Sequence, residues 1–484
     1  MAPRFFYLVF SCHFLLLACF PARAEDAKPN ILFLFTDDQA PWAFGAAGNK
    51  EASTPNLDQL AKEGMYLPNS FTVTPVCSPS RVELWTSRYG SEVGITDWIK
   101  PQARFFTDNP QDQPGIDPSL PNVAKQLKSA GYSTALIGKY HLGERPECHP
   151  TNVGFDYFMG FLEGGTTPEN PTLEKDGENK SFKGLTVDIL TEDALEYLKN
   201  AKDKENPFFL SVHYRAPHTK WLPVAPSDWE PFENLDPTLA HPDYPGLDVE
   251  RAKRMMREYL ASVKGVDRNV GRILKLLNEL GFSENTVVVY TSDHGYNMAH
   301  NGIWHKGNGH WLLKKEMMPP ATENIPAGQR PNLYDNSIRI PTIVRWPEKI
   351  QPGTVCENSV TNLDWFPTFA EIAGAPLEKD SVVRGRSIVS LLDGSSADWE
   401  DEVFLQYSTK HQSRTHMRGW RSRSYKLVRD FLNPERDEFY DLKADPGETE
   451  NLIHRLPEGL ESVIQEFDRK IRTEMEKIGD NVDG

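Results

Sequence analysis

The pentapeptide Cys77-Ser78-Pro79-Ser80-Arg81 has the composition of a reactive centre. Proline has a fixed φ and no N–H, which suits the first turn of a helix. Cys77 then lies at a helix N-terminus, where unpaired N–H groups favour negative charge, and Arg81 follows one turn later. The motif predicts a cysteine-derived nucleophile beside an anion clamp. A buried structural cysteine in front of an ordinary helix is the alternative.

Acidic side chains stand at the ends of two apolar runs, residues 30–35 and 286–291. Such runs are typical of strands buried on both faces. Three carboxylates and one further ligand suit a hard divalent cation, and calcium is favoured, with magnesium the weaker alternative, because oxygen ligands dominate. Taken singly, each acidic strand end also fits a helix cap or a turn. The predicted metal ligands are Asp37, Asp38, Asp293 and His294.

Basic side chains follow the predicted strands 133–137 and 207–212 and the segment that begins at Asp293. Any one of them alone fits a solvated lysine or a core histidine. Their common placement around a metal site, in an acidic protein, indicates a pocket for a compact dianion. Besides Arg81, the predicted pocket residues are Lys139, His141, His218 and Lys306.

Helices and buried strands alternate along most of the chain, which predicts an α/β fold with a large, mainly parallel or mixed sheet flanked by helices. Helices are expected at 54–64, 121–130, 186–200, 249–280 and 363–373. Long connections at 101–121, 160–184, 220–248 and 307–332 are expected to be functional loops. Short alternating segments between 403 and 441 and a helix at 458–478 predict a smaller C-terminal α+β subdomain, a short antiparallel sheet plus one helix. The expected boundaries are a catalytic domain at 25–384 and a C-terminal subdomain at 385–484.

The first 24 residues have the basic, apolar and small-residue regions of a secretory signal ending in Ala24. Lipidation of Cys19 is a minor alternative to cleavage after Ala24. Removing residues 1–24 takes away two arginines and no acid, which leaves 51 basic against 69 acidic residues and a net charge of −18. We therefore expect an exported protein that repels nucleic acid. No later stretch is apolar for long enough to form a transmembrane segment.

Three cysteines remain after the signal is removed: Cys77, Cys148 and Cys356. Three cysteines in so long an exported chain do not form a disulfide framework. A bridge between Cys148 and Cys356 stays open at this point.

Together these motifs resemble those of the type I, formylglycine-dependent sulfatases of the alkaline phosphatase superfamily. The resemblance covers nearly the whole mature chain. It is carried by Thr36-Asp37-Asp38-Gln39, Cys77-Ser78-Pro79-Ser80-Arg81, Gly138-Lys139-Tyr140-His141-Leu142-Gly143, Ala216-Pro217-His218, Ser292-Asp293-His294-Gly295, Leu333-Tyr334-Asp335, Ile343-Val344-Arg345-Trp346-Pro347, Glu438-Phe439-Tyr440-Asp441-Leu442 and Asp445-Pro446-Gly447-Glu448.

The resemblance implies that a formylglycine-generating maturation enzyme converts Cys77 into an aldehyde, whose hydrate attacks sulfur. Arg81 and Lys139 would hold the formylglycine and sulfate oxygens, and His141 would take the proton whose loss expels sulfate. His218 and Lys306 would flank the sulfate, with His218 as acid towards the leaving alcohol. Residues 309–331 look like an insertion, so Lys314 and Lys315 compete with Lys306 for its role.

The predicted function is removal of sulfate from a sulfated sugar or polysaccharide by an exported enzyme. The sugar rests on analogy and on polar loops whose rings could stack on a substrate, such as Trp304, His305, His310 and Trp311. A phosphonate monoester or phosphodiester hydrolase of the same superfamily is the close alternative. A non-catalytic glycan-binding relative is the alternative of another class.

Overall fold

The computed structural model describes residues 28–101, 114–396 and 398–482. The predicted signal segment and most of the predicted loop 101–121 lie outside these residues. None of the helices in the described part of the chain is long and apolar enough to cross a membrane.

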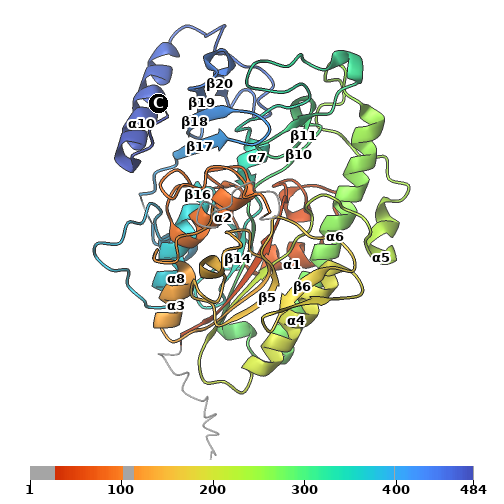
Figure 1. Ribbon diagram of the computed structural model, residues 1–484, viewed down its shortest axis with the longest axis vertical. Coiled ribbons are helices and arrows are strands. Elements are labelled where there is room, and N and C mark those ends of the chain that lie inside the picture. The colour runs from red at the N-terminus through yellow and green to blue at the C-terminus, as the bar shows by residue number, and fades with distance from the viewer. Residues whose placement is uncertain (1–27, 102–113, 397, 483–484) are drawn as a thin grey trace, which may run out of the picture.

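A mixed sheet crosses the middle of the molecule (Figure 1). Its ten strands pair in the order β15-β2-β14-β9-β1-β8-β4-β5-β6-β7. Its five central strands are parallel: β5 (Tyr157–Phe161), β4 (Ser133–Lys139), β8 (Phe208–His213), β1 (Asn30–Thr36) and β9 (Thr286–Ser292). The outer strands are β2 (Met65–Tyr66), β6 (Thr172–Lys175), β7 (Glu178–Ser181), β14 (Ile343–Arg345) and β15 (Thr354–Val355). The predicted α/β class with a mainly parallel or mixed sheet is confirmed.

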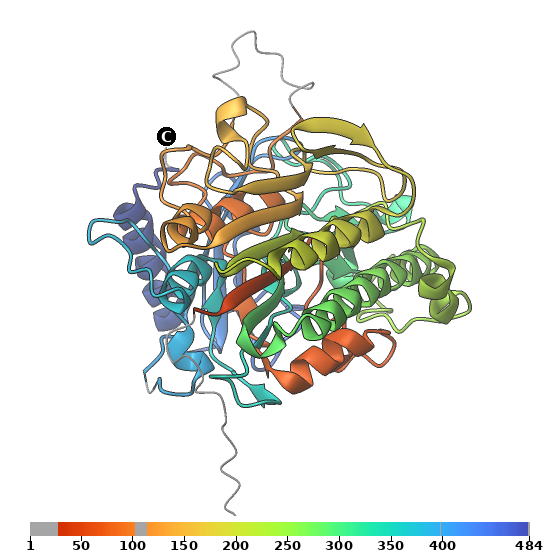
Figure 2. The same cartoon turned by 90° about the horizontal axis from the view of Figure 1, so that it is seen from below.

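Helices cover both faces of this sheet, as Figure 2 shows from below. The first face carries α2 (Cys77–Thr86), α3 (Val123–Ser129) and α8 (Trp365–Ile372), and the second carries α1 (Pro55–Glu63), α4 (Thr186–Ala201) and α6 (Val249–Glu279). Strand β1 explains the arrangement, because its side chains alternate between the two cores. Phe33 and Phe35 enter the first core and Leu32 and Leu34 enter the second, all with no exposed surface.

The predicted loop 160–184 is in part a β-hairpin, and the prediction of an unstructured connection was wrong there. β6 and β7 pair through a two-residue turn in which Asp176 and Gly177 both have positive φ, 59° and 76°. Asp-Gly is favoured in such turns because both positions must adopt the left-handed region. The strands Thr172–Lys175 and Glu178–Ser181 are mostly polar and partly exposed, so the apolar alternation that marks a strand is absent.

Short elements fill the remaining connections. They are β3 (Ser70–Phe71), β10 (Asn297–Met298), β11 (Ile303–His305), β12 (His310–Trp311), β13 (Arg339–Ile340), β16 (Val360–Thr361), α5 (Pro226–Trp229), α7 (Asp335–Ile338) and α9 (Val389–Leu392). The three described cysteines are all free thiols, so Cys148 and Cys356 are not bridged.

The C-terminal part forms the predicted antiparallel sheet and helix. Its strands pair in the order β17 (Val403–Thr409), β18 (Thr415–Arg421), β19 (Tyr425–Asp430) and β20 (Glu438–Asp441), and α10 (Glu461–Ile478) packs on them. The core beneath α10 also contains Val73 and Val76, which directly precede α2. This sheet therefore supports the segment that carries Cys77.

A buried ionic network joins the C-terminal sheet to the rest of the protein. Arg421 Nη2 lies 2.8 Å and Lys426 Nζ 2.9 Å from the carboxylate oxygens of Asp335, and Lys426 also pairs with Glu448. Asp335 and Glu448 belong to two of the motifs that carry the family resemblance. Their role here is to fix the two parts of the chain to each other.

Candidate active site

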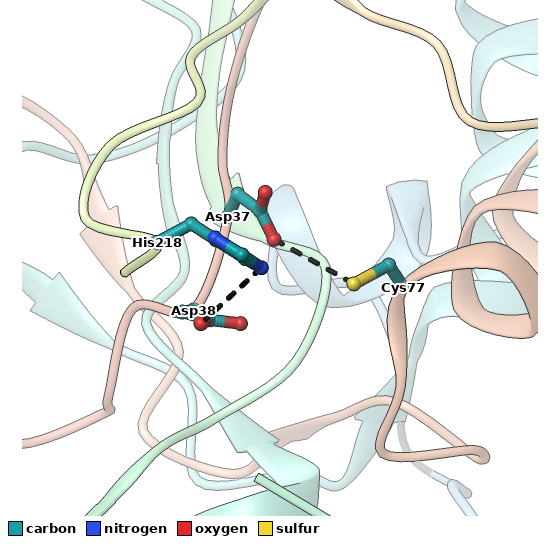
Figure 3. Close-up of side chains that lie close together, drawn as sticks. All are labelled: Asp37, Asp38, Cys77 and His218. Carbon is teal, nitrogen blue, oxygen red and sulfur yellow. Dashed lines mark hydrogen bonds and ion pairs between the residues drawn. The ribbon is translucent and has the colours of Figure 1, made fainter. Parts of the chain in front are cut away.

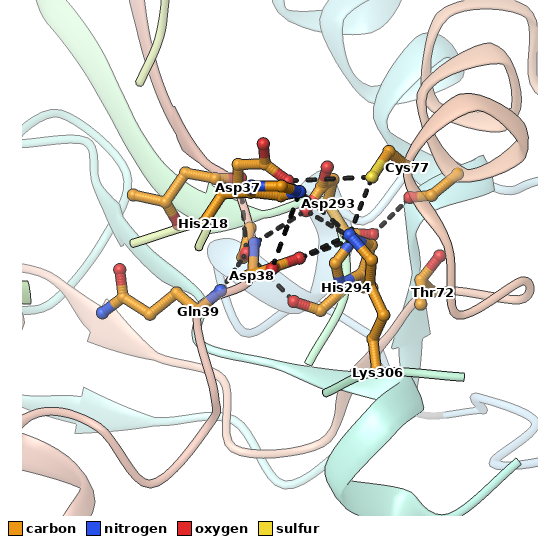
Figure 4. Close-up of polar contacts among 12 residues, drawn as sticks. Asp37, Asp38, Gln39, Thr72, Cys77, His218, Asp293, His294 and Lys306 are labelled. Atoms are coloured by element: carbon orange, nitrogen blue, oxygen red, sulfur yellow. Dashed lines mark hydrogen bonds and ion pairs between the residues drawn. The ribbon is translucent and has the colours of Figure 1, made fainter. Parts of the chain in front are cut away.

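The predicted site residues gather at the carboxyl ends of the central strands, where open α/β sheets place their ligands. Asp37 and Asp38 follow β1 and His218 follows β8, while α2 brings Cys77 to the same point (Figure 3). Asp293 follows β9. Residues far apart in the sequence thus surround one point (Figure 4).

Cys77 is the first residue of α2, as the Pro79 motif predicts. Its side chain is buried, and its sulfur lies 2.9 Å from Lys306 Nζ and 3.8 Å from Asp37 Oδ1. The residue before it, Val76, has extended backbone and offers no side-chain cap. Sγ therefore lies at the helix N-terminus with a cation and a carboxylate as neighbours, at the position that an oxygen of a modified residue 77 would occupy.

Each of the three buried carboxylates is paired with one basic side chain. Lys139 Nζ lies 2.6 Å from Asp37 Oδ2, and Lys306 Nζ lies 2.6 Å from Asp38 Oδ1. Arg81 contacts Asp293 Oδ2 through Nε at 3.1 Å and Nη2 at 2.9 Å. The formal charges of these six side chains cancel.

The basic neighbours do not affect the pKa values of the three acids equally. Burial by itself would raise the pKa of each, but Lys139 and Lys306 hold the pKa values of Asp37 and Asp38 below the usual range. For Asp293, burial outweighs its favourable neighbours and raises the pKa to about 6. Asp37 and Asp38 are thus held as carboxylates, chiefly by the two lysines.

His294 indicates that a cation belongs among these carboxylates. Its Nδ1 lies 3.0 Å from the carbonyl oxygen of Gly295, which fixes the proton on Nδ1. Burial lowers its pKa, so Nε2 carries a lone pair. That Nε2 has no hydrogen-bond partner in the described structure and lies 3.2 Å from Asp293 Oδ1 and 3.3 Å from Asp38 Oδ1.

A lone pair aimed at carboxylate oxygens is repulsive unless a cation or a proton lies between them. Asp38 Oδ2 is also buried without a partner in the described residues. Ligand atoms of Asp37, Cys77, Asp293 and His294 all lie within 4.8 Å of one another, as do those of Asp37, Asp38, Cys77 and His218. Each group contains two carboxylates, whose oxygens are the ligands that a hard divalent ion prefers.

His141 is placed as a neutral base. Its backbone has a positive φ of 60°, and its Nε2 lies 2.9 Å from the carbonyl oxygen of Ile99, which makes Nε2 the donor. Burial, aided by Lys139, holds the pKa of His141 well below its usual range. Its Nδ1 is buried and has no partner among the described residues, so it can accept a proton.

His218 lies near the same carboxylates. Its Nδ1 lies 2.7 Å from the carbonyl oxygen of Thr219, and its Nε2 lies 4.0 Å from Asp38 Oδ2. Burial lowers its pKa to about 4, against the opposing effect of Asp38 and Asp37. His218 is therefore neutral in this state, and a bound anion would have to raise its pKa before it could donate a proton.

Lys306 occupies the position next to Cys77, whereas the competing Lys314 and Lys315 are exposed. A cavity of about 440 Å³ opens above these groups and is lined by Cys77, Trp98, Ile99, Pro101, His141, Glu163, Gly164, Gly165, His218, His305, Lys306 and Asn308. Of the four rings predicted to meet a sugar, only His305 is part of this lining; Trp304, His310 and Trp311 are not.

Two supporting residues were missed by the sequence reasoning. His213 Nδ1 lies 3.2 Å from Arg81 Nη1, and Asn362 Nδ2 donates to the carbonyl oxygen of Ser80 at 3.0 Å. His213 is the last residue of β8. A histidine at the end of a buried strand could have indicated a residue of the site. Asn362 lies 282 residues from Ser80, and nothing in its local sequence marks it.

Family models and known proteins match most of this chain. The family model described as Sulfatase matches residues 29–375, and one described as N-sulphoglucosamine sulphohydrolase, C-terminal, matches residues 329–477. An N-acetylglucosamine-6-O-sulfatase of Bacteroides thetaiotaomicron is 29% identical over 518 residues, which cover 90% of this chain and 84% of the relative.

Two solved structures extend the comparison. One, in complex with its substrate D-glucosamine-2-N,6-O-disulfate, has a TM-score of 0.78 and 25% identity, and the match covers 94% of this chain and 99% of the other. The phosphonate monoester hydrolase of Agrobacterium radiobacter has a TM-score of 0.68 and 18% identity, with 93% and 96% covered. The second likeness shows a common fold alone.

Proposed function

Because this chain belongs to the sulfatase family of the alkaline phosphatase superfamily, and is thus a sulfuric ester hydrolase, we propose that it removes sulfate from a sulfated carbohydrate through a formylglycine formed at Cys77. The observation that carries the proposal is the environment of the Cys77 sulfur. Lys306 Nζ at 2.9 Å and the N-terminus of α2 would both stabilise negative charge on an attacking oxygen at this position.

The charge balance of the site supports a bound cation beside an anionic substrate. The three acids already neutralise Arg81, Lys139 and Lys306, so an added anion needs an added cation. Asp37, Asp38, Asp293 and His294 would hold a divalent cation, with calcium favoured over magnesium. When bound, that ion would supply the positive charge that favours ionisation of a hydroxyl on residue 77.

The basic side chains have separate roles in this proposal. Lys139 and Arg81 would orient the sulfate and the hydrated aldehyde, and Lys306 would bind a sulfate oxygen. His141 would accept, at its unpartnered Nδ1, the proton of the remaining hydroxyl, so that the C–O bond to sulfate breaks and the aldehyde returns. His218 would protonate the leaving alcohol once the anion has raised its pKa.

A sulfated sugar is the proposed substrate class. The Bacteroides relative is named for N-acetylglucosamine-6-O-sulfate, and a similar solved structure holds a disulfated glucosamine as its substrate. The cavity beside Cys77 combines Trp98 and Ile99 with polar groups such as Asn308, which suits a ring with hydroxyls.

Turnover of an aryl sulfate against that of the matching aryl phosphodiester tests the reaction type. We expect faster release of the aryl alcohol from the sulfate. Faster cleavage of the phosphodiester would instead assign the chain to the phosphonate monoester or phosphodiester hydrolases. Membership of the sulfatase family sets aside the third alternative, a glycan-binding relative without activity.

Export and maturation complete the proposal. Residues 1–24 would direct the chain out of the cytoplasm, with lipidation at Cys19 as the minor alternative, and a maturation enzyme would read the Cys77–Arg81 motif. Residues 25–384 would form the catalytic domain and residues 385–484 the C-terminal subdomain.

A further inference from the structure

A second, larger cleft adjoins the catalytic cavity. Its volume is about 1010 Å³, and it shares Glu163 and Gly165 with the lining of the cavity above Cys77. The loop after β5, the β6–β7 hairpin and the segment after β8 form its walls. A substrate with more than one sugar ring would extend from the catalytic cavity into this cleft.

Arg215 is a buried cation in the wall of this cleft. Only 5% of the residue is exposed. Its Nε donates to the carbonyl oxygen of Thr166 at 2.7 Å, and its Nη1 donates to that of Lys220 at 2.7 Å. These two bonds fix the plane of the guanidinium.

No acid in the described chain forms an ion pair with Arg215. Its Nη2 makes no hydrogen bond to the described residues, yet it is not one of their buried unpartnered atoms, so this nitrogen keeps some accessible surface in a residue that lines the cleft. Burial lowers the pKa of Arg215 to about 10, and the side chain is therefore still charged at neutral pH. Asp37 and Asp38 act on this charge only from beyond ion-pair distance. A buried charge without an acidic contact is costly, which makes a bound anion favourable at this point.

The other charged residues of the wall limit how many anions fit. They are Glu144, Glu163, Glu169, Glu174 and Lys220. Glu174 is paired with His149 at 3.0 Å, and Lys220 is exposed. A densely charged polyanion would meet carboxylates over most of the cleft, whereas one anionic group could reach Arg215.

We propose that Arg215 binds one anionic group, a carboxylate or a second sulfate ester, on a sugar next to the one that loses its sulfate. Arg215 and His218 are three residues apart, so their Cα atoms are separated by at most about 11 Å. That span is within reach of a disaccharide. The planar guanidinium suits both groups, because it offers two parallel N–H donors to a carboxylate or a sulfate. The inference rests on the proposed function, since it assigns a neighbouring subsite to that substrate.

The test compares three disaccharides of 6-O-sulfated N-acetylglucosamine whose neighbouring sugar is galactose, glucuronic acid or sulfated galactose. For the wild type we expect the highest kcat/KM with one of the two disaccharides that have an anionic neighbouring sugar. Which of these two has the higher kcat/KM shows whether Arg215 binds a carboxylate or a sulfate. Arg215→Gln should lower kcat/KM for that substrate relative to the galactose one by roughly 10- to 100-fold, mainly through KM. Arg215→Lys should lose less, because it keeps the charge without the fork.

Arg455→Gln is the matched control, since it makes the same substitution at an exposed arginine that does not line the cleft. It should change the ratio of kcat/KM values by less than about threefold. Thermal unfolding of each variant shows whether the fold persists. If Arg215→Gln does not fold, the same kcat/KM comparison is made with Arg215→Lys.

Two results would overturn the proposal: a wild type without preference for an anionic neighbour, or an Arg215→Gln variant that loses activity equally with all three disaccharides. If the wild type cleaves no sulfate ester at all, the proposed function itself is wrong. Calorimetric binding of the same three disaccharides to wild type and Arg215→Gln then still tests Arg215, because it needs no turnover.

Discussion

Three acids and three bases share one buried space around Cys77, and this balance defines the chemistry of the site. Asp37, Asp38 and Asp293 are each satisfied by a basic side chain, while His294 Nε2 and His141 Nδ1 have no partner in the described structure. His294 Nε2 faces carboxylates, an arrangement that a bound cation would stabilise. His141 Nδ1 lies beside the cavity and can take a proton.

His141→Ala tests the proposed role of His141 Nδ1 as proton acceptor. Without the base, we expect the first half of the reaction to proceed and the second to stall, because the remaining hydroxyl of residue 77 keeps its proton. An aryl sulfate should then give a burst of about one alcohol per active site, followed by steady turnover reduced at least about 100-fold. His416→Ala, on β18, is the control. A uniform slowing without a burst would contradict the assigned role.

Metal removal tests the proposed role of His294 Nε2 as a metal ligand. Chelation should reduce turnover roughly 100-fold or more, because the ion supplies the charge that stabilises the attacking oxygen. The midpoint of thermal unfolding should fall as well, since the cation separates groups that repel one another. Calcium should restore both properties better than magnesium. Full activity in protein shown by elemental analysis to be metal-free would refute the metal site.

At the scale of elements, the carboxyl ends of β1, β4, β8 and β9 and the N-terminus of α2 bring the site together. Four of the five central strands, β1, β4, β8 and β9, were predictable because both faces are buried, which gives continuous apolar runs such as residues 30–35. The fifth, β5, was not predicted. The β6–β7 hairpin was not predictable, because its residues are polar on a partly exposed edge. Helix α10 starts at Glu461 rather than at 458, and Gly459 has a φ of 89°, outside the helical region.

The packing of α1 on α6 carries a pH-dependent prediction. Asp267 on α6 accepts hydrogen bonds from Leu57 N at 2.8 Å and Asn56 Nδ2 at 2.7 Å. Burial raises the pKa of Asp267 to about 6, above its unfolded value near 3.9. Between these values the folded state binds more protons, so the contribution of Asp267 to the free energy of unfolding falls as pH rises towards 6.

Asp267→Asn removes this dependence. The free energy of unfolding of Asp267→Asn minus that of the wild type should therefore increase by about 2 kcal/mol between pH 4 and pH 7. A constant difference in stability between the two proteins does not affect this increase. Denaturant unfolding at both pH values measures the difference. Asp236→Asn, which removes an exposed carboxylate, is the control. A difference that stays the same at both pH values would contradict the account.

At the scale of the whole molecule, the order of the motifs along the chain predicted the family and the sheet. It could not predict contacts made only in the folded state. Asn362 supports Ser80 across 282 residues, and Arg215 becomes notable only when its lack of an acidic partner and its position beside a cleft are known. Such roles depend on burial and on partners from distant segments, which local sequence patterns do not encode.

Export of the whole chain gives a prediction that does not depend on the site. Expression in a secretory host should yield a protein that begins at Glu25, because Ala22 and Ala24 fit the cleavage pattern. N-terminal sequencing of the exported protein measures this. A membrane-bound product that begins with a lipidated Cys19 would establish the alternative.

The identity of residue 77 in active protein tests the central claim most directly. Protein made together with a formylglycine-generating enzyme is digested, and the mass of the peptide that spans Cys77 is compared with sulfatase activity over preparations of differing maturation. We predict an aldehyde in place of the thiol, activity proportional to the aldehyde fraction, and no turnover by Cys77→Ala despite retained sugar binding. Full activity in protein that carries only the unmodified thiol would contradict the mechanism.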